Sequence, residues 1–471
     1  MIGHPGLSPA DDDTHGIEAQ ASERFLALSA ERRSQVLERL ETERWSRGFT
    51  YERDGKPELI SLGTMPIVLS ESLANQLYEL AMAARRVMAC LPDLWLASPA
   101  VRRVMPLSVD EESWIRDTWS PEHHRSQGII SRLDADIKLS GGGAPTARFF
   151  EYNGVAVGGL YYAEVAEALA EEVLLPALGI RGLTRPPRIP KMILEELCRQ
   201  GTSIGEPARR ILLLENRDWD SGITEAPQFV RIWRELGHDA VIGDPRDLEI
   251  RGDEICHDGI AYDLFYRHME VRDLLDLEAG SGRLEAVRRA FRENRVVSSL
   301  SGEFDHKAAW EVVADPECAG AFPRQDLSKI MPHIPWTRVV RATRTTVPGG
   351  ATGDLLEYVR ASRESLVIKP NRECGGIGVT LGPRTSASEW GSAVDRALQA
   401  PGEWVAQSLV SNASKRFPVP DAQAGFAVSP RYVAYGFAAT AGGLGCLGRY
   451  SASRVVNVSM GGGIVPVMRA A

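Results

Sequence analysis

The sequence predicts a mixed α/β protein with both α/β and α+β portions. A short apolar run at 211–214, a helical stretch at 227–236 and a second apolar run at 240–242 give the strand, helix, strand order of a small parallel lobe. The last third alternates segments of strand and helix character. A chain of 471 residues also exceeds one ordinary hydrophobic core, so we expect two or three lobes with ligand-binding clefts between them.

Two helices and a hairpin are expected in the first 200 residues. After a disordered start, Ser29 can cap a helix that runs to about residue 45. A second helix follows Ser70, and its apolar residues step by four and three as in one buried stripe: Leu73, Leu77, Leu80, Ala84 and Val87. Extended segments at 129–137 and 147–153, joined by the glycines at 141–143, predict a β-hairpin.

A linker is expected near residue 200. Helix returns at about 161–175, and the proline-rich stretch 186–190 and the region 201–207 then interrupt regular patterns. We therefore expect one region over 1–200, a small α/β lobe over 205–300 and a third region over 301–471. In this third region the expected strands are 366–368, 378–381, 404–410, 432–440 and 455–458, and the expected helices are 357–363 and 386–398.

Composition excludes several classes of protein. The net charge of −9 argues against a surface that neutralises nucleic-acid phosphates. Six cysteines lie scattered without C-x-x-C spacing, which indicates neither a zinc site nor a disulfide framework. There is no long apolar run and no basic-then-apolar leader, so we expect a cytoplasmic protein without a membrane span.

A lysine at the end of a strand opens a glycine loop in the segment 366–378. Lys369 is followed by Glu373, Gly375 and Gly376. A fixed lysine can neutralise phosphates, and glycines let a backbone approach them closely. The same glycines could instead form a plain hairpin turn. The segment is neither a Walker loop nor a G-x-G-x-x-G turn.

Four polar residues share one face of the predicted hairpin. With a turn centred between Gly142 and Gly143, Asp134 faces Glu151 and Arg132 faces Asn153. Two carboxylates directly opposite each other repel unless a cation lies between them, and oxygen ligands suit magnesium. The alternative is a solvated face on which Arg132 offsets the acids. A one-residue slip of the turn would break the pairing.

Three further residues are weak signals individually. Lys307 begins a predicted helix, Gln407 lies in the strand that starts at Trp404, and Arg449 precedes the glycine run 461–463. Each also has an ordinary structural explanation: a surface lysine, a core strand and a surface hairpin.

In their order along the chain, these elements resemble the ATP-grasp ligases with circularly permuted topology, which include glutathionylspermidine synthetase and the eukaryotic type of glutathione synthetase. Arg132-Leu133-Asp134 and Glu151-Tyr152-Asn153 resemble the R-x-D and E-x-N hairpin of that family. The segment 369–376 resembles its K-P-x-R-E-G-G-G loop, with Cys374 where a glycine is usual. The resemblance implies a permuted ATP-grasp fold with a small Rossmann-like lobe at 205–300 and an ATP-binding lobe at 301–471.

The resemblance also implies roles for single residues. The implied magnesium ligands are Asp134, Glu151, Asn153 and Glu373. ATP phosphates would be held by Lys307 and Lys369 beside Gly375 and Gly376, with Gln407 near the adenine. Arg132 would stabilise charge on the transferring phosphoryl group, and Arg449 would meet the substrate carboxylate. The family often has a lysine two residues after that arginine, where this chain has Ser451.

The activity so implied is ATP-dependent joining of a carboxylate to an amine through an acyl phosphate, with release of ADP and phosphate. Its substrates would be an amino acid or small peptide in a biosynthetic pathway, and an acyl group on a carrier protein also fits. Two alternatives use the same residues: a small-molecule kinase and a non-catalytic nucleotide-binding protein.

A dinucleotide oxidoreductase is disfavoured, because the turn after 211–214 begins with Glu215 and Asn216 and lacks glycines. This turn and the segment Tyr266-Arg267-His268 either face an acceptor substrate or are ordinary polar starts of loops.

Overall fold

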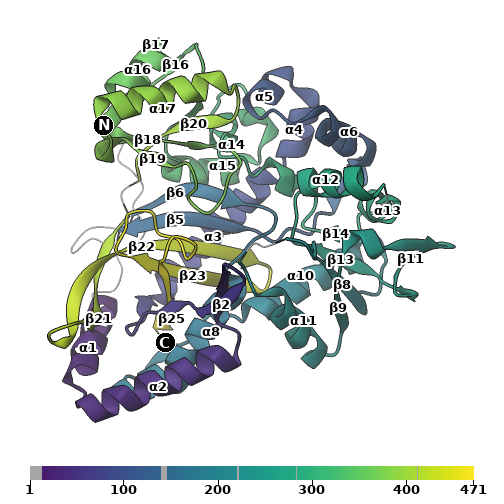
Figure 1. The fold of residues 1–471 in the computed structure, drawn as a ribbon. Helices are drawn as coiled ribbons and strands as arrows, with labels where there is room; N and C mark the ends of the chain where they lie inside the picture. Colours follow the sequence, from purple (N-terminus) through teal and green to yellow (C-terminus); the bar gives the residue numbers. More distant parts are fainter. Residues whose placement is uncertain (1–12, 139–145, 220–221, 283, 411, 471) are drawn as a thin grey trace.

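The computed structural model describes residues 13–138, 146–219, 222–282, 284–410 and 412–470. The chain forms a mixed α/β fold in which three main sheets are flanked by helices (Figure 1). Within these ranges, no helix combines the length and the apolar character needed to cross a membrane.

The N-terminal part is mostly helical. Its elements are α1 (Asp13–Ala27), α2 (Ala30–Ser46), β1 (Thr50–Arg53), β2 (Lys56–Leu59), β3 (Ser61–Leu62), β4 (Ile67–Leu69), α3 (Glu71–Met88), α4 (Leu91–Ala97), α5 (Pro99–Val104), α6 (Val109–Thr118) and α7 (Pro121–Arg125). Ser29 caps α2 with its side chain, as predicted. The helix predicted after Ser70 is α3; the side chain of Ser70 caps it, and its apolar stripe is buried. The expectation of a disordered start was wrong from Asp13 onward, since α1 packs Ala21 and Phe25 into the core.

The central sheet unites distant parts of the chain. Its order is β3-β24-β23-β22-β5-β6, with β21 paired to the outer part of β22. Besides β3, its strands are β5 (Arg132–Lys138), β6 (Thr146–Asn153), β21 (Ser414–Asp421), β22 (Gly425–Thr440), β23 (Gly443–Ser451) and β24 (Gly463–Val465). The predicted hairpin is therefore β5–β6, and the C-terminal strands extend its sheet. A separate sheet of β4-β25-β7 includes β7 (Leu183–Thr184) and β25 (Val467–Ala470).

A helical segment connects the hairpin to the small parallel sheet. It comprises α8 (Leu160–Leu169), a π-helical turn (Ala170–Leu174), α9 (Leu175–Leu178) and α10 (Ile189–Ile204). The predicted linker near residue 200 was wrong, because α10 runs through it. Pro190 lies in the first turn of α10, where a missing N–H costs nothing, and Gly205 ends the helix in a left-handed conformation.

The small parallel sheet has the predicted strand, helix, strand start. Its order is β14-β13-β8-β9. Its elements and neighbours are β8 (Arg210–Leu214), α11 (Ala226–Glu235), β9 (Asp239–Gly243), β10 (Glu249–Arg251), β11 (Glu254–His257), β12 (Ile260–Ala261), β13 (Leu264–Arg267), α12 (Val271–Ser281), α13 (Glu285–Arg292) and β14 (Val296–Val297).

The last main sheet is antiparallel, in the order β15-β20-β18-β19. This part contains α14 (Ala309–Val313), α15 (Arg324–Ile330), β15 (Thr337–Val339), β16 (Arg344–Thr346), β17 (Thr352–Asp354), α16 (Leu355–Ala361), β18 (Leu366–Pro370), β19 (Thr380–Leu381), α17 (Ala387–Gln399) and β20 (Trp404–Ser408). It has its own small core, in which α16 and α17 pack against β18 and β20. In Figure 1 it lies above the hairpin, so β5 and β6 separate it from β22 and β23.

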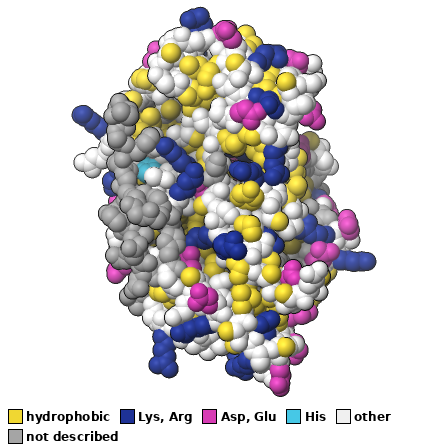
Figure 2. All heavy atoms as spheres, turned by 90° about the vertical axis from the view of Figure 1, so that its left-hand side faces the viewer, with side chains coloured by type: hydrophobic (Ala, Val, Ile, Leu, Met, Phe, Trp, Pro, Cys, Tyr) yellow, Lys and Arg dark blue, Asp and Glu magenta, His cyan; other side chains and the backbone are white. Residues whose placement is uncertain are grey.

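The predicted strand at 455–458 was wrong. These residues form an irregular loop between β23 and β24. Val455, Val456 and Asn457 line the cavity between the hairpin and the antiparallel sheet, and none of the described strands pairs with them. On the molecular face shown in Figure 2, basic and acidic side chains are interspersed with hydrophobic ones.

Candidate active site

The hairpin brings Asp134 opposite Glu151 and Arg132 opposite Asn153, as predicted. The turn glycines 141–143 lie outside the described residues. Nearer the turn the register differs by one residue, since Ala135 pairs with Phe149. Phe150 is an extra residue, a β-bulge, between these two pairs. Because the bulge compensates for the shift of one residue, Asp134 still lies opposite Glu151.

Asp134 is held by two arginines and is 1% exposed. Its Oδ1 accepts a 2.6 Å bond from Arg132 Nε, and its Oδ2 accepts a 2.8 Å bond from Arg449 Nη2. Burial favours a raised pKa of Asp134, but the charges of Arg132 and Arg449 outweigh it and lower the pKa. The hairpin face at Asp134 is therefore not solvated. The positive charges beside Asp134 are those of Arg132 and Arg449.

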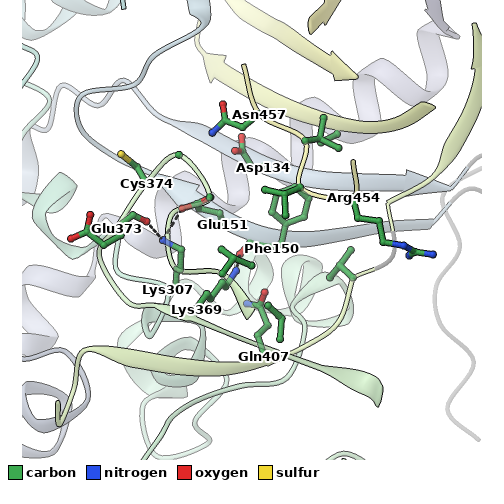
Figure 3. Close-up of a pocket in the computed structure, with 18 of the residues that line it drawn as sticks. Asp134, Phe150, Glu151, Lys307, Lys369, Glu373, Cys374, Gln407, Arg454 and Asn457 are labelled. Atoms are coloured by element: carbon green, nitrogen blue, oxygen red, sulfur yellow. Dashed lines mark hydrogen bonds and ion pairs between the residues drawn. The ribbon is translucent and has the colours of Figure 1, made fainter. Parts of the chain in front are cut away.

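Lys307 connects the hairpin to the glycine loop. Its Nζ lies 2.8 Å from Glu151 Oε1 and donates a 2.7 Å bond to the main-chain oxygen of Glu373 (Figure 3). Burial opposes the charge of Glu151, yet the charges of Lys307 and Lys369 lower its pKa. Two segments more than 200 residues apart thus meet at one ammonium group.

Lys369 is the last residue but one of β18 and is almost fully buried. Its Nζ donates a 2.9 Å bond to the carbonyl of Phe150, the bulged residue of the hairpin. Burial lowers the pKa of Lys369 to about 7, with Glu151 acting in the opposite direction. An anion that enters the cavity would stabilise the charged form of this lysine.

The glycine loop requires glycine. Gly375, Gly376 and Gly378 have φ values of 72°, 82° and 72° in the left-handed region. A Cβ on Gly376 would meet Val455 at 2.7 Å, and Ser459 Oγ donates to the Gly375 carbonyl at 3.2 Å. The loop after β23 therefore covers the glycine loop closely.

Arg372 holds the glycine loop from the other side, and sequence reasoning assigned it no role. Its guanidinium lies 2.7 Å from Glu111 on α6 and 3.2 Å from Glu270 before α12. Burial raises the pKa of Glu270 to about 8, with Asp305 and Glu303 adding to the effect. No local pattern marks Glu111 or Glu270 as its partners, because they are distant in the chain.

All residues that the sequence singled out for the site line one cavity, which has a volume of about 980 Å³ including space open to solvent. They are Arg132, Asp134, Glu151, Asn153, Lys307, Lys369, Glu373, Gly375, Gly376, Gln407 and Arg449. In Figure 3, Glu373, Lys307 and Glu151 lie close together, and Gln407 lies apart from them. Val367, Leu381 and Leu409 add an apolar wall near Gln407, whose Nε2 donates 2.9 Å to Thr337 Oγ1.

The chemistry of this lining fits a nucleotide. Buried lysines and a glycine backbone suit phosphates, and an apolar wall with an amide suits a base. For magnesium, Glu151 and Asn153 offer oxygen donors, whereas Glu373 is 51% exposed at its side chain and lies 3.9 Å from Arg272. The described residues contain no group of three His, Cys, Asp or Glu side chains that could hold a metal ion. This donor set fits an ion that takes its other ligands from phosphates and water.

Comparison with known proteins identifies the fold. A glutathione synthetase-like effector from Globodera pallida, solved in its apo form, superposes with a TM-score of 0.60 over 98% of both chains, at 9% identity. The chain has a glutathione synthetase-like ATP-grasp fold. No protein-family model matches it.

Sequence similarity links the chain to a longer protein. It is 27% identical over 289 residues to "Putative glutamate–cysteine ligase 2-2" of Frankia casuarinae. The matched region covers 59% of this chain and only 31% of that protein. A "Putative gamma-glutamylcysteine synthetase" of Methylobacillus flagellatus gives a TM-score of 0.38 at 10% identity, over 81% of this chain and 84% of that one. D-alanyl-alanine synthetase A of Vibrio cholerae gives a TM-score of 0.26 at 11% identity, over 48% of this chain and 66% of that one.

Proposed function

We propose that this protein is an ATP-dependent carboxylate–amine ligase of circularly permuted ATP-grasp topology. The observation that carries the proposal is Lys307, whose ammonium joins Glu151 of the hairpin to the glycine loop at Glu373. Phosphoryl transfer needs positive charge at the transferring oxygens more than it needs an acid or a base. Lys307, Lys369 and Arg132 surround one cavity and supply that charge.

In this proposal a carboxylate oxygen of the first substrate attacks the γ-phosphorus of ATP. The bond between that phosphorus and the bridging oxygen breaks, and ADP leaves. An amine then attacks the carbonyl carbon of the acyl phosphate, the carbon–oxygen bond to phosphate breaks, and the amine proton leaves with the phosphate. Magnesium, held by Glu151 and Asn153 with Asp134 and Glu373 nearby, would neutralise phosphate oxygens.

Each remaining side chain has a defined task in the proposal. Arg449 keeps Nε buried without a partner among the described residues, so this N–H can meet a substrate carboxylate. Gln407 lies at the apolar end, where an adenine would sit. Covering of the glycine loop by the segment around Val455 would keep water from the acyl phosphate. The relative from Frankia, named for joining glutamate to cysteine, supports an amino acid as substrate.

The decisive experiment measures phosphate release from ATP with magnesium across a panel of carboxylates crossed with amines. We expect release that requires one carboxylate and one amine, with an amide as product. ADP formation without free phosphate would instead identify a kinase, and failure to bind ATP would refute both functions.

A further inference from the structure

A second cleft lies at the carboxyl edge of the small parallel sheet, where β8 and β9 end. It has a volume of about 1350 Å³, including space open to solvent, and its walls include the turn 215–219 after β8. A smaller cavity of about 340 Å³ continues from it and shares Glu215, Trp219 and Ile223 with it. His268, just after β13, lines the inner cavity.

The inner cavity ends against the residues that hold Arg132. Gly158 forms part of its wall, and the carbonyl of Gly158 accepts a hydrogen bond from Arg132 Nη1. Ala156 in the same wall has a φ of 50°, a strained value for a residue with a side chain. The wall of the inner cavity thus contacts Arg132, which itself lines the cavity that contains Lys307 and Lys369.

Three large apolar side chains are exposed among the mostly polar walls of the second cleft. Trp219 is 47% exposed, and Ile223 and Ile242 are each 37% exposed. Large apolar side chains that gather at an open concavity mark a place where a ligand removes them from water.

The two cavities differ in charge. The nucleotide cavity is lined by five Lys or Arg residues: Arg132, Lys307, Lys369, Arg449 and Arg454. In the second cleft, Asp218, Asp244 and Asp247 are paired with Arg217 or Arg246. Glu52 and Glu215 also line it, and neither has a Lys or Arg partner within the described parts of the chain. The cleft therefore carries uncompensated negative charge.

His268 adds a hydrogen-bond acceptor at the inner end. Its Nε2 is buried and has no hydrogen-bond partner in the part of the chain that the structure describes. Its Nδ1 lies 3.9 Å from Glu215 Oε1. The carboxylate favours the tautomer with its proton on Nδ1, which leaves Nε2 as an acceptor. The neighbouring Arg267 is fully buried on Glu303 and takes no part.

We propose that the second cleft binds the amine substrate, and that this substrate is a cationic amine with an apolar body. Its ammonium group pairs with Glu215 and donates to His268 Nε2, and its apolar part lies against Trp219, Ile223 and Ile242. This inference rests on the proposed ligase function, for which the cleft supplies the second substrate.

Binding of a matched pair of probes tests the inference without turnover. 2-Phenylethylamine and 3-phenylpropanoate have similar shapes and opposite charges, and the signal is the fluorescence difference between the wild-type protein and Trp219→Phe. We expect only the amine to change this difference, and Glu215→Gln to weaken its binding by about tenfold or more. Equal responses to both probes, or none, would overturn the inference.

Matched variants guard against indirect effects. Glu41→Gln changes an exposed glutamate on α2, and Trp45→Phe changes a tryptophan that is 48% exposed, close to the value for Trp219. Neither should alter the response to the amine. If Glu215→Gln is less stable than the wild-type protein, Glu215→Asp keeps the charge and should retain most of the binding.

Failure of this inference and failure of the ligase function give different results. Hydroxylamine attacks an acyl phosphate at its carbonyl carbon, releases phosphate and forms a hydroxamate without a second cleft. If ATP and a panel of carboxylates give hydroxamate while the cleft binds no amine, only the present inference falls. If no carboxylate gives hydroxamate, the proposed ligase function falls.

Discussion

The ammonium nitrogen of Lys369 lies 2.9 Å from the main-chain oxygen of Phe150, the residue that a β-bulge adds to β6. A bulged residue is left out of the ladder, so its carbonyl is free to accept this bond. The bulge thereby performs two tasks: it aligns Asp134 with Glu151, and it anchors the lysine of the glycine loop beside them. Four predictions follow from this arrangement and its surroundings.

Replacement of Lys369 by methionine should remove activity and stabilise the protein below neutral pH. Burial lowers the pKa of Lys369 from 10.5 to about 7. Between these values the unfolded chain binds more protons than the folded one, so stability rises with pH there, and the cost of burying the charge is complete below about pH 7. Lys369→Met should therefore raise the Tm more at about pH 6 than at about pH 9, and lower kcat by about 100-fold.

Thermal unfolding at both pH values, without nucleotide, measures the effect. The exposed Lys191, which pairs with Glu195 on α10, provides the control. Lys191→Met should show no such dependence on pH. An equal change of Tm for Lys369→Met at both pH values would contradict the assigned cause.

Replacement of Glu151 by glutamine should lower ATP-dependent phosphate release by about 100-fold or more, because the cavity loses a charge that orients Lys307. The same change leaves Lys307 without its carboxylate partner, so its charge remains available to bind the phosphates of ATP. The affinity for ATP should therefore change less than kcat. Steady-state kinetics with ATP varied separates the two effects. Glu235→Gln, at a surface ion pair with Arg231, should leave both values unchanged.

An alanine at Gly436 should displace the arginine and acid pair of the hairpin. Gly436 on β22 lies opposite Asp134, and a Cβ there would meet Arg132 Cδ at 2.6 Å and Asp134 Oδ1 at 2.9 Å. We expect loss of stability of about 1–3 kcal/mol and loss of most activity. Chemical denaturation and phosphate release measure the two.

Gly280 serves as the matched glycine. It lies inside α12, with no atom within 4 Å of an added Cβ. Gly280→Ala should stabilise by about 0.5–1 kcal/mol, because alanine loses less entropy in a helix. If Gly280→Ala lost as much activity as Gly436→Ala, the displacement of Arg132 and Asp134 would not explain the loss in Gly436→Ala.

Arg372 and Glu111 should be strongly coupled. Burial opposes the charge of Glu111, and Arg372 lowers its pKa nonetheless. Arg372→Ala should destabilise the protein and raise the KM for ATP, because the glycine loop loses its anchor on α6. A double-mutant cycle with Glu111→Gln should give a coupling free energy of about 1–3 kcal/mol. Additive effects on stability would contradict a direct interaction.

Local patterns predicted much of the fold. The cap at Ser29, the buried stripe of α3 and the strand that carries Lys369 near its end depend on patterns within one element. The pairing of Asp134 with Glu151 was also predicted. The sequence did not predict the bulge at Phe150. A turn centred between Gly142 and Gly143 would pair Asp134 with Glu151 without a bulge, whereas in the structure the strands near the turn are shifted by one residue and the bulge compensates for the shift.

The sequence by itself determined the residue types of the site and their order along the chain, because helix and strand periods place side chains on faces without help from distant residues. Only the tertiary structure decided which charges meet. Asp134 pairs with Arg449 across 315 positions, and Lys369 reaches Phe150 across 219. It also turned an expected linker into α10, since burial of Ile193 and Leu197 outweighs the signals of the flanking proline and glycine. Such contacts depend on how whole elements pack, which no local spacing encodes.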